Sequence, residues 1–182
     1  MQKKTQKILK KILLTTFLLS FTSSSLALTT QFTQNSTYEV CFTPKEKCTQ
    51  KIADNITHAK QEILVEAYSF TSKPIANALS KAKSNGVDVK IIMDKDQVKE
   101  NNWMTSILQK KKIPIFTNYE LKGLAHNKIM IIDKTKIITG SFNFTKAAQK
   151  YNLENVLIIE DAGLAEKYRE EWLKQFQNSK AM

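Results

Sequence analysis

Two short apolar runs on either side of an amphipathic segment constrain the fold of this chain more than any other feature. The runs cover residues 63–68 and 87–93, and each has the length of a buried strand. Between them, Pro74 suits the first turn of a helix and Gly86 suits its carboxyl-terminal cap. The apolar stripe of that helix consists of Ile75, Ala78, Leu79 and Ala82. A strand, a helix and a second strand in this order predict parallel strands in a sheet with helices packed on it.

The remaining segments extend this α/β pattern. Further helices are predicted over three segments: 49–59, 104–111 and 164–176. Four further strands are predicted: 113–116, 127–133, 137–142 and 152–159, of which the middle two form a hairpin. Residues 144–150 suit a short helix or turn, residues 94–103 a charged loop, and residues 28–40 carry no clear pattern. The expected fold class is therefore α/β, with a mixed central β-sheet flanked by helices.

The first 27 residues have the organisation of a secretory signal peptide. Five lysines without an acidic residue precede an apolar run over residues 12–21, and Ser25-Leu26-Ala27 supplies a small-residue cleavage site. That run is about half of the roughly 20 residues that a membrane-spanning helix needs. We therefore expect cleavage after Ala27, a single domain over residues 28–182, and a secreted or periplasmic protein. The alternative is a leader that is retained as an amphipathic anchor.

The charge of the chain restricts its partners. The formal net charge is +11, and about +6 remains once the lysines of the predicted leader are removed. A basic protein of this kind favours a polyanionic partner, either nucleic acid or an anionic lipid surface, although solubility alone also explains the charge. Arg169 is the only arginine. Phosphate binding would therefore use lysine charges and neutral donors instead of bidentate guanidinium groups.

The two cysteines lie close together in the sequence. Pro44 and polar residues occupy the turn-forming segment between Cys41 and Cys48. In an exported protein, this spacing predicts a small disulfide-closed loop. A metal site would need four ligands, and no neighbouring Cys or His supplies the others. We therefore expect a structural disulfide between Cys41 and Cys48.

Polar side chains interrupt the apolar strands of the predicted hairpin. His126 and Lys128 are two residues apart, so both project from one face of a strand, and the same holds for Ser141 and Asn143. The hairpin can bring the two pairs together. An imidazole, an ammonium, a hydroxyl and a carboxamide at one place suit a phosphodiester, because the lysine and the neutral donors can hold phosphate oxygens while the imidazole attacks phosphorus.

The spacing of these residues matches a known motif. His126-x-Lys128-x4-Asp133-x6-Gly140-Ser141-x-Asn143 resembles the HKD motif of the phospholipase D superfamily. The chain is also similar to the small single-motif bacterial endonucleases of this superfamily, and to short secreted bacterial proteins labelled phospholipase D, at residues 67–71, 86–90, 140–148 and 154–155. The resemblance covers roughly residues 40–176 and implies a phospholipase D/nuclease-like fold.

The resemblance also implies a mechanism and a homodimer. Members of the superfamily use two HKD motifs, and one histidine attacks phosphorus to form a phosphohistidine. The second histidine protonates the leaving oxygen and then activates water. This chain has one motif, so the resemblance implies that two chains meet at a two-fold axis and share one active site. Imidazole has a pKa of about 6.5, so one neutral and one protonated histidine coexist readily near neutral pH.

Individual roles follow from the same resemblance. The candidate catalytic residues are His126, Lys128, Asp133 and Glu154, and the candidate substrate-binding residues are Lys128, Ser141 and Asn143. In the resembling endonucleases, the glutamate that matches Glu154 accepts a hydrogen bond from the other ring nitrogen of the nucleophile, which fixes the tautomer. Asp133 faces away from His126 by strict alternation, so we expect a structural role near the site without contact to phosphate. Ser141 ranks below Lys128 and Asn143 as a phosphate contact.

Other residues are weaker candidates. His58 lies on the first predicted helix without a partner pattern, and we expect a structural role for it. Trp103 suits either stacking on a nucleic-acid base or contact with lipid, or else the first core position of the next helix. The sequence contains no glycine-rich nucleotide loop and no metal-ligand cluster, and the resemblance requires no metal, so no cofactor is expected.

Together these features predict an enzyme that hydrolyses phosphodiesters without a metal. Nucleic acid, DNA or RNA, is the expected substrate, because the resemblance to endonucleases runs along the domain and a basic surface suits an extended polyanion. The first alternative is a phospholipase D that cleaves the head group of phospholipids at a membrane. The second is a non-catalytic module that binds phosphate, although the intact His126, Lys128 and Asn143 argue against it.

Overall fold

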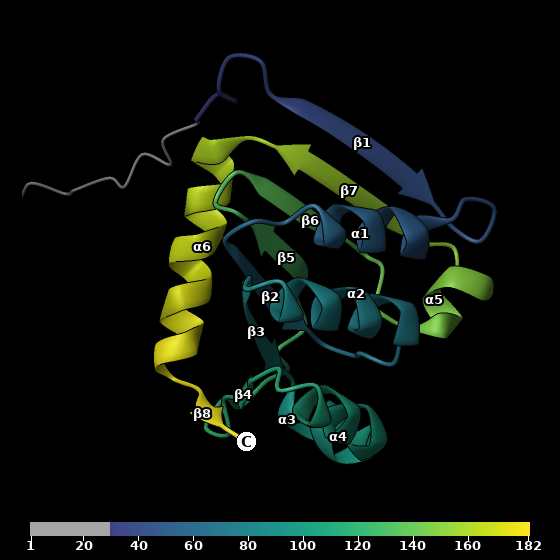
Figure 1. Cartoon of the computed structure of the whole chain (residues 1–182), viewed down its shortest axis with the longest axis vertical. Coiled ribbons are helices and arrows are strands. Elements are labelled where there is room, and N and C mark those ends of the chain that lie inside the picture. Colours follow the sequence, from purple (N-terminus) through teal and green to yellow (C-terminus); the bar gives the residue numbers. More distant parts are fainter. Residues whose placement is uncertain (1–29) are drawn as a thin grey trace, which may run out of the picture. The chain divides into compact units, whose positions relative to one another are not determined.

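Eight strands form one mixed sheet in the order β1-β7-β6-β5-β2-β3-β4-β8 (Figure 1). The strands are β1 Thr37–Phe42, β2 Glu62–Ala67, β3 Asp88–Met93, β4 Ile115–Thr117, β5 Lys128–Ile132, β6 Lys136–Gly140, β7 Asn155–Glu160 and β8 Lys180–Ala181. The pairs β2–β3 and β3–β4 are parallel, and all other neighbours are antiparallel. The computed structural model describes residues 30–182, so the predicted signal peptide over residues 1–27 lies outside the described residues.

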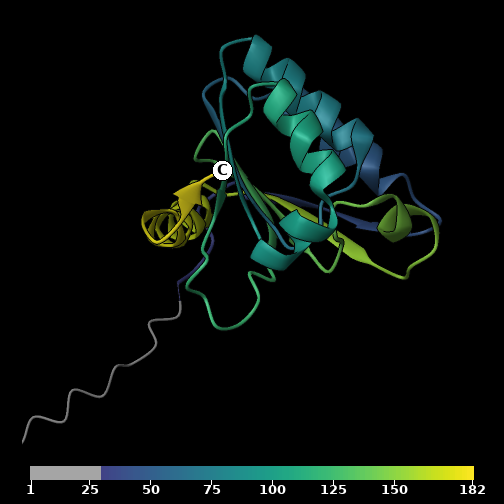
Figure 2. The same ribbon diagram turned by 90° about the horizontal axis from the view of Figure 1, so that it is seen from below.

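Helices cover both faces of the sheet. They are α1 Cys48–Thr57, α2 Lys73–Ser84, α3 Lys95–Glu100, α4 Asn102–Lys110, α5 Lys146–Lys150 and α6 Ala162–Gln177. Figure 2 shows α6 on one side of the sheet, with α1 and α2 on the other. The larger core cluster packs beneath α1 and α2, and a smaller cluster around Trp172 packs beneath α6. Within residues 30–182, no helix is both long enough and apolar enough to cross a membrane.

The structure confirms the predicted fold class and the unit from β2 to β3. Pro74 lies in the first turn of α2, and Gly86 directly after its end has a φ of +90°, a conformation that glycine adopts without steric cost. The aromatic stripe of α6 packs in the core as expected. Trp172 is 1% exposed, and its indole N–H donates to the Val65 carbonyl at 2.9 Å.

Three local predictions are wrong. Residues 94–103 are not a loop, because α3 and the start of α4 lie there. The Asp94 carboxylate caps α3 by accepting from the backbone N–H groups of Asp96 and Gln97, at 3.0 and 3.2 Å. The lead-in over residues 28–40 runs into an unpredicted strand, β1, which pairs along its length with β7. The two-residue strand β8 was also missed, and it pairs with β4.

The predicted disulfide is present. Cys41 in β1 bonds to Cys48 at the start of α1, with a Cα–Cα distance of 5.6 Å, and both residues are fully buried. The bridge therefore ties the edge strand of the sheet to a helix that covers it.

Removing the bridge lowers stability by a predictable amount. Closing a loop of this size restricts the unfolded chain, so we expect the double variant Cys41→Ala/Cys48→Ala to lose about 2 kcal/mol of unfolding free energy. Urea denaturation of the variant and of the wild-type protein, each with and without reductant, measures the loss. An unfolding free energy that neither the variant nor reduction changes would contradict a stabilising bridge.

Candidate active site

The polar residues of the HKD motif other than Asp133 gather at one edge of the sheet, where four central strands begin or end. β2 ends at Ala67 and β5 begins at Lys128, and these two residues are paired across the strands. β6 ends at Gly140, which pairs with Val156 near the start of β7. The antiparallel order therefore brings both halves of the motif to the same edge.

His126 and Lys128 lie together at this edge. His126 precedes β5 and is exposed, whereas Lys128 is only 8% exposed. The Lys128 ammonium donates to the backbone carbonyl of His126 at 2.6 Å and lies 3.1 Å from its Nδ1. An accessible imidazole thus stands beside a fixed positive charge, an arrangement that suits attack on an anionic phosphodiester.

Tyr68 contacts both of these residues, and the sequence analysis assigned it no role. Its ring centroid lies 4.4 Å from that of His126, and the Lys128 ammonium lies 5.0 Å from the Tyr68 ring centroid. The backbone N–H of Tyr68 donates to the Asn127 carbonyl at 2.9 Å. Its position directly after an apolar strand was visible in the sequence, but its contact with His126 depends on the β2–β5 register.

Burial perturbs the charge of Lys128. Loss of water around the ammonium lowers the pKa of Lys128 below its usual value, and the negative charge of Glu154 partly opposes this effect. Among residues 30–182, no carboxylate pairs directly with this partly buried cation, which costs stability and favours binding of an anion.

A Lys128→Met variant tests this cost. Because folding lowers the pKa of Lys128, the unfolded chain binds more protons between the folded pKa and the usual value of 10.5, and the contribution of Lys128 to stability rises with pH across that window. We expect Lys128→Met to be as stable as the wild type or more stable at pH 7. Its unfolding free energy should also rise less with pH across that window. Urea denaturation across the alkaline range measures both. Lower stability of the variant at pH 7 would show a structural role for the lysine.

Ser141 and Glu154 form a second group at the edge. The Ser141 hydroxyl donates to a Glu154 carboxylate oxygen at 2.5 Å and accepts from the Asn155 backbone N–H at 3.1 Å. The other Glu154 oxygen accepts from the Asn152 side chain at 2.9 Å. Within residues 30–182, Glu154 makes no hydrogen bond to His126, so the expected bond that would orient the imidazole is not formed in this structure. Ser141 and Asn152 take its place.

Gly140 sets the approach of β6 to β7 at this point. Its φ is +143°, in the region that favours glycine, and a Cβ built on it would lie 2.3 Å from the Asn155 carbonyl oxygen. Any larger residue would push the two strands apart. The glycine of the motif therefore places Ser141 within reach of Glu154.

Asn143 is held between two buried aromatic residues. Phe142 and Phe144 are 2% and 1% exposed and anchor the segment on either side. The Asn143 side chain makes no hydrogen bond to His126 or Lys128 within residues 30–182, and its Oδ1 is buried without a partner. An unsatisfied buried carbonyl oxygen costs about 1–3 kcal/mol. Contact with a phosphate oxygen would use the amide N–H groups of Asn143, because Oδ1 can only accept.

Asp133 lies away from this cluster, at the other end of β5. Its carboxylate accepts from the backbone N–H groups of Lys60, Gln61 and Glu62 at 2.8, 2.7 and 3.1 Å. The expectation that Asp133 lies near the site is therefore corrected, whereas its place among the candidate catalytic residues stays a prediction. Its φ of +52° lies at the β5–β6 turn, so Asp133 shapes the hairpin. Its three hydrogen bonds hold the start of β2.

Glu66, near the end of β2, and His58, at the end of α1, are two further polar groups. Glu66, which is 4% exposed, has its pKa raised by burial, while a hydrogen bond from the side chain of Asn127 opposes the shift. Glu66 was not singled out from the sequence. His58 is exposed on α1, and its Nδ1 lies 2.6 Å from the Asp54 carbonyl oxygen. Within residues 30–182, no group of three or more His, Cys, Asp or Glu side chains could hold a metal ion.

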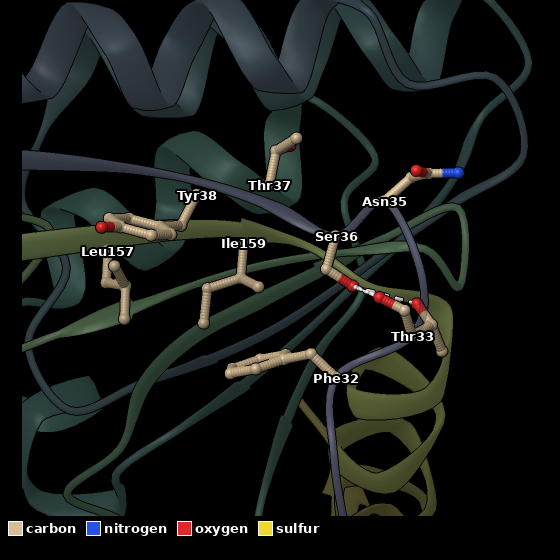
Figure 3. A pocket seen from close by; sticks show the side chains of 8 residues that line it. All are labelled: Phe32, Thr33, Asn35, Ser36, Thr37, Tyr38, Leu157 and Ile159. Carbon is tan, nitrogen blue, oxygen red and sulfur yellow. Dashed lines mark hydrogen bonds between the residues drawn. The ribbon is translucent and has the colours of Figure 1, made fainter.

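A separate hollow of about 460 Å³ lies along β1 and β7, toward the Asp161 end of β7 (Figure 3). The side chains of Phe32, Tyr38 and Ile159 line it, and no described residue lining it is charged. The Asp161 carboxylate accepts from the hydroxyls of Ser36 and Thr33 beside it. Because it lacks a charged group and a free nucleophile, this hollow is not a candidate for phosphodiester chemistry.

Comparison with known proteins agrees with the fold and the motif. Residues 52–176 match the family described as cardiolipin synthase, PLD-like domain. The chain therefore belongs to the phospholipase D superfamily, and it is a phosphodiesterase-type hydrolase of that class.

Individual relatives refine this assignment. The chain is 46% identical over 140 residues to a phospholipase D of Rickettsia bellii, a match that covers 77% of this chain and 69% of that protein. It is 33% identical over 114 residues to the mitochondrial cardiolipin hydrolase of Mus musculus, covering 63% of this chain and 51% of that protein. Nuc, a phospholipase D family member from Salmonella typhimurium, superimposes with a TM-score of 0.76 at 33% identity, covering 81% and 98% of the two chains.

Proposed function

We propose that this protein is a metal-independent endonuclease that hydrolyses phosphodiester bonds of DNA or RNA through a phosphohistidine on His126. The observation that carries the proposal is the exposed His126 imidazole beside the buried ammonium of Lys128. In the proposed first step, His126 attacks phosphorus and the bond to the leaving oxygen breaks. Water then attacks phosphorus, and the bond to His126 breaks. Lys128, Asn143 and Ser141 hold the phosphate oxygens, with Ser141 as the weakest of these contacts.

The chemistry requires a second titratable group to protonate the leaving oxygen. Each chain has only two histidines, and His58 lies on α1 against its own helix, so it is unsuited to this task. We therefore propose a homodimer in which two copies of His126, Lys128 and Asn143 meet at a two-fold axis. One His126 acts as the nucleophile, and the other acts first as the acid and then as the base.

Glu154 has a positioning role in this proposal. Its carboxylate is held by Ser141 and Asn152, and its charge acts on Lys128. When a histidine becomes positively charged in the shared site, the negative charge of the Glu154 carboxylate stabilises that positive charge. The hydrogen bond to the imidazole expected from the sequence would belong to that assembled state.

The charge of the protein supports nucleic acid as the substrate. A net charge of about +6 remains once the lysines of the predicted leader are removed, and a basic protein attracts extended polyanions. Its one arginine serves the fold, because Arg169 pairs with Glu62 at 2.8 Å and with Glu166 at 3.5 Å. Lysines therefore supply the positive charges that contact phosphate.

Phospholipid cleavage is the second candidate, and exposed apolar side chains favour it. Phe42, Tyr151 and Leu153, on the segments that flank Glu154, are 56%, 76% and 90% exposed. Exposed aromatic and aliphatic groups beside an active site can contact a lipid surface. The relatives from Rickettsia bellii and Mus musculus are named for phospholipid substrates.

A parallel assay separates the candidates. The protein and its His126→Ala variant are incubated in excess EDTA with plasmid DNA, single-stranded DNA, and vesicles of phosphatidylcholine or cardiolipin. We expect nicking and strand cleavage that survive EDTA and require His126. His126-dependent release of a lipid head group with intact DNA would instead establish a phospholipase D. If neither substrate is cleaved while phosphate-dependent binding persists in both proteins, the chain is a non-catalytic binding module.

We also propose that the protein acts outside the cytoplasm, in the periplasm or after secretion. The Cys41–Cys48 disulfide supports this location, because such bonds persist in oxidising compartments and are rare in the cytosol. Cell fractionation followed by mass determination of the purified chain tests the location together with the cleavage expected after Ala27. A protein confined to the cytoplasm with free thiols would refute it.

A further inference from the structure

A basic groove lies beside the candidate active site, on segments to which the proposed chemistry assigns no role. Its volume is about 660 Å³, and its walls come from the starts of α2 and α4 and from α5. We define the basic groove by Lys73, Trp103, Lys146 and Lys150. No acidic side chain is among the described residues that line it.

The basic groove borders the cluster around His126. The backbone N–H groups of Thr71 and Ser72, on one wall, donate to the Phe144 carbonyl at 3.0 and 2.9 Å. Phe144 directly follows Asn143, and Thr71 lies three residues after Tyr68, the residue that contacts His126. The same two segments therefore line the groove and supply side chains to the site.

The lysines of the basic groove have no acidic partners. Lys73, Lys146 and Lys150 are exposed, and none of them forms an ion pair within residues 30–182. By contrast, Lys51 and Lys90 pair with carboxylates elsewhere on the surface. Three uncompensated ammonium groups around one hollow suit successive phosphates of a polyanion.

Trp103 gives the basic groove an aromatic surface. It is 42% exposed at the start of α4, so it is not a core residue, and the Lys73 ammonium lies 5.9 Å from its ring centroid. An exposed indole flanked by cations can stack on a nucleic-acid base. Only an unpaired base can reach it, because in a duplex both faces of each base are covered by its neighbours.

We infer that the basic groove binds unpaired nucleotides next to the scissile phosphate of a single-stranded nucleic acid, with one base on Trp103 and phosphates on Lys73, Lys146 and Lys150. This inference rests on the proposed endonuclease function and narrows its substrate to single strands. A membrane is a poorer fit, because Trp103 is the only aromatic side chain among the described residues that line this hollow, and a flat lipid surface cannot enter it.

Intrinsic fluorescence tests the inference directly. The protein has two tryptophans and Trp172 is 1% exposed, so quenching by a bound base reports Trp103. We expect an oligothymidylate to quench the His126→Ala protein, which binds without cleavage. Variants at this position lack the reporter, so their affinity is measured from the fluorescence anisotropy of a labelled oligonucleotide. Adding Trp103→Ala should weaken binding of the single strand about tenfold and leave duplex binding unchanged. Trp103→Phe keeps an aromatic ring and should lose less.

Salt dependence tests the lysines. Lys73, Lys146 and Lys150 are replaced by alanine in the His126→Ala protein. Each phosphate contact on a single strand contributes about 0.7 to the slope of log affinity against log salt, so the loss of three contacts should reduce the slope by about two. Tyr38→Ala and Lys167→Ala are matched controls, because they remove an exposed aromatic on β1 and an exposed lysine on α6. Neither should change binding.

The outcomes separate this inference from the proposed function. If the wild type cleaves no nucleic acid, the endonuclease proposal fails and the inference fails with it. If the wild type cleaves DNA, but Trp103→Ala and the triple lysine variant bind single strands like the parent, the groove inference alone is wrong. If Trp103→Ala and the triple lysine variant bind anionic vesicles more weakly but bind oligonucleotides like the parent, the groove contacts a membrane and the inference is overturned.

Discussion

Replacement of His126 by alanine lowers the rate of phosphodiester cleavage by about 10⁴-fold or more, with the fold intact. The expected loss is this large because, in the proposed mechanism, the imidazole forms the covalent bond to phosphorus and, in the partner copy, supplies the acid. His126 is exposed and precedes β5, so its removal disturbs little packing. Steady-state rates on an oligonucleotide, with urea denaturation alongside, measure both effects.

His58→Ala is the matched control for this variant. His58 is also exposed, directly follows α1, and its Nδ1 lies 2.6 Å from the Asp54 carbonyl oxygen of that helix. Its replacement should leave the rate unchanged. If His126→Ala retains more than about a tenth of the wild-type rate, or if His58→Ala loses as much, then His126 is not the nucleophile.

For the proposed homodimer, we expect a mixed dimer of wild-type and His126→Ala chains to have almost no activity. The proposed shared site needs both copies of His126, one as nucleophile and one as acid, so a single wild-type chain could not complete the reaction. When equal amounts of the two chains are co-folded, random pairing leaves about one quarter of the dimers with two wild-type chains. We expect activity to fall as the square of the wild-type fraction.

Two differently tagged chains allow the mixed dimer to be isolated and assayed by itself. Mixing wild type with His58→Ala provides the control and should leave activity unchanged at every ratio. An isolated mixed dimer with half of the wild-type activity would show that each chain carries a complete site. Full activity of a monomer, established by light scattering, would contradict the shared site as well.

The parts of the fold that depend on local pattern could be predicted from the sequence. The strand, helix and strand of residues 62–93 follow from apolar periodicity and from Pro74 and Gly86 at the helix ends. The hairpin of β5 and β6 follows from two apolar runs around a tight turn. These signals lie within one element or between neighbours in the chain.

The missed elements depend on contacts between distant segments. β1 is an edge strand whose ladder partner, β7, lies more than a hundred residues away, and most of its residues are exposed, so it lacks clear alternation. β8 has two exposed residues and is defined only by its pairing with β4. In α3, the charged sequence resembles a loop, and only the capping carboxylate of Asp94 signals a helix.

The candidate site shows the same division. The identities of His126, Lys128, Ser141 and Asn143 follow from the motif. His126 precedes β5, and Ser141 and Asn143 follow β6, so strand alternation does not place either pair. The motif cannot show that Asp133 holds the start of β2, because that contact crosses from one strand end to a loop 72 residues away. Nor can it show Tyr68 against His126, which depends on the register of β2 with β5.

The stereochemical course at phosphorus tests the central claim most directly. An oligonucleotide with one internucleotide phosphorothioate of known configuration is cleaved in isotopically labelled water, and the configuration of the product is determined. Attack by His126 followed by attack of water gives two in-line displacements, so the account predicts retention of configuration. Inversion would mean that water attacks phosphorus in a single step, and it would contradict the phosphohistidine mechanism.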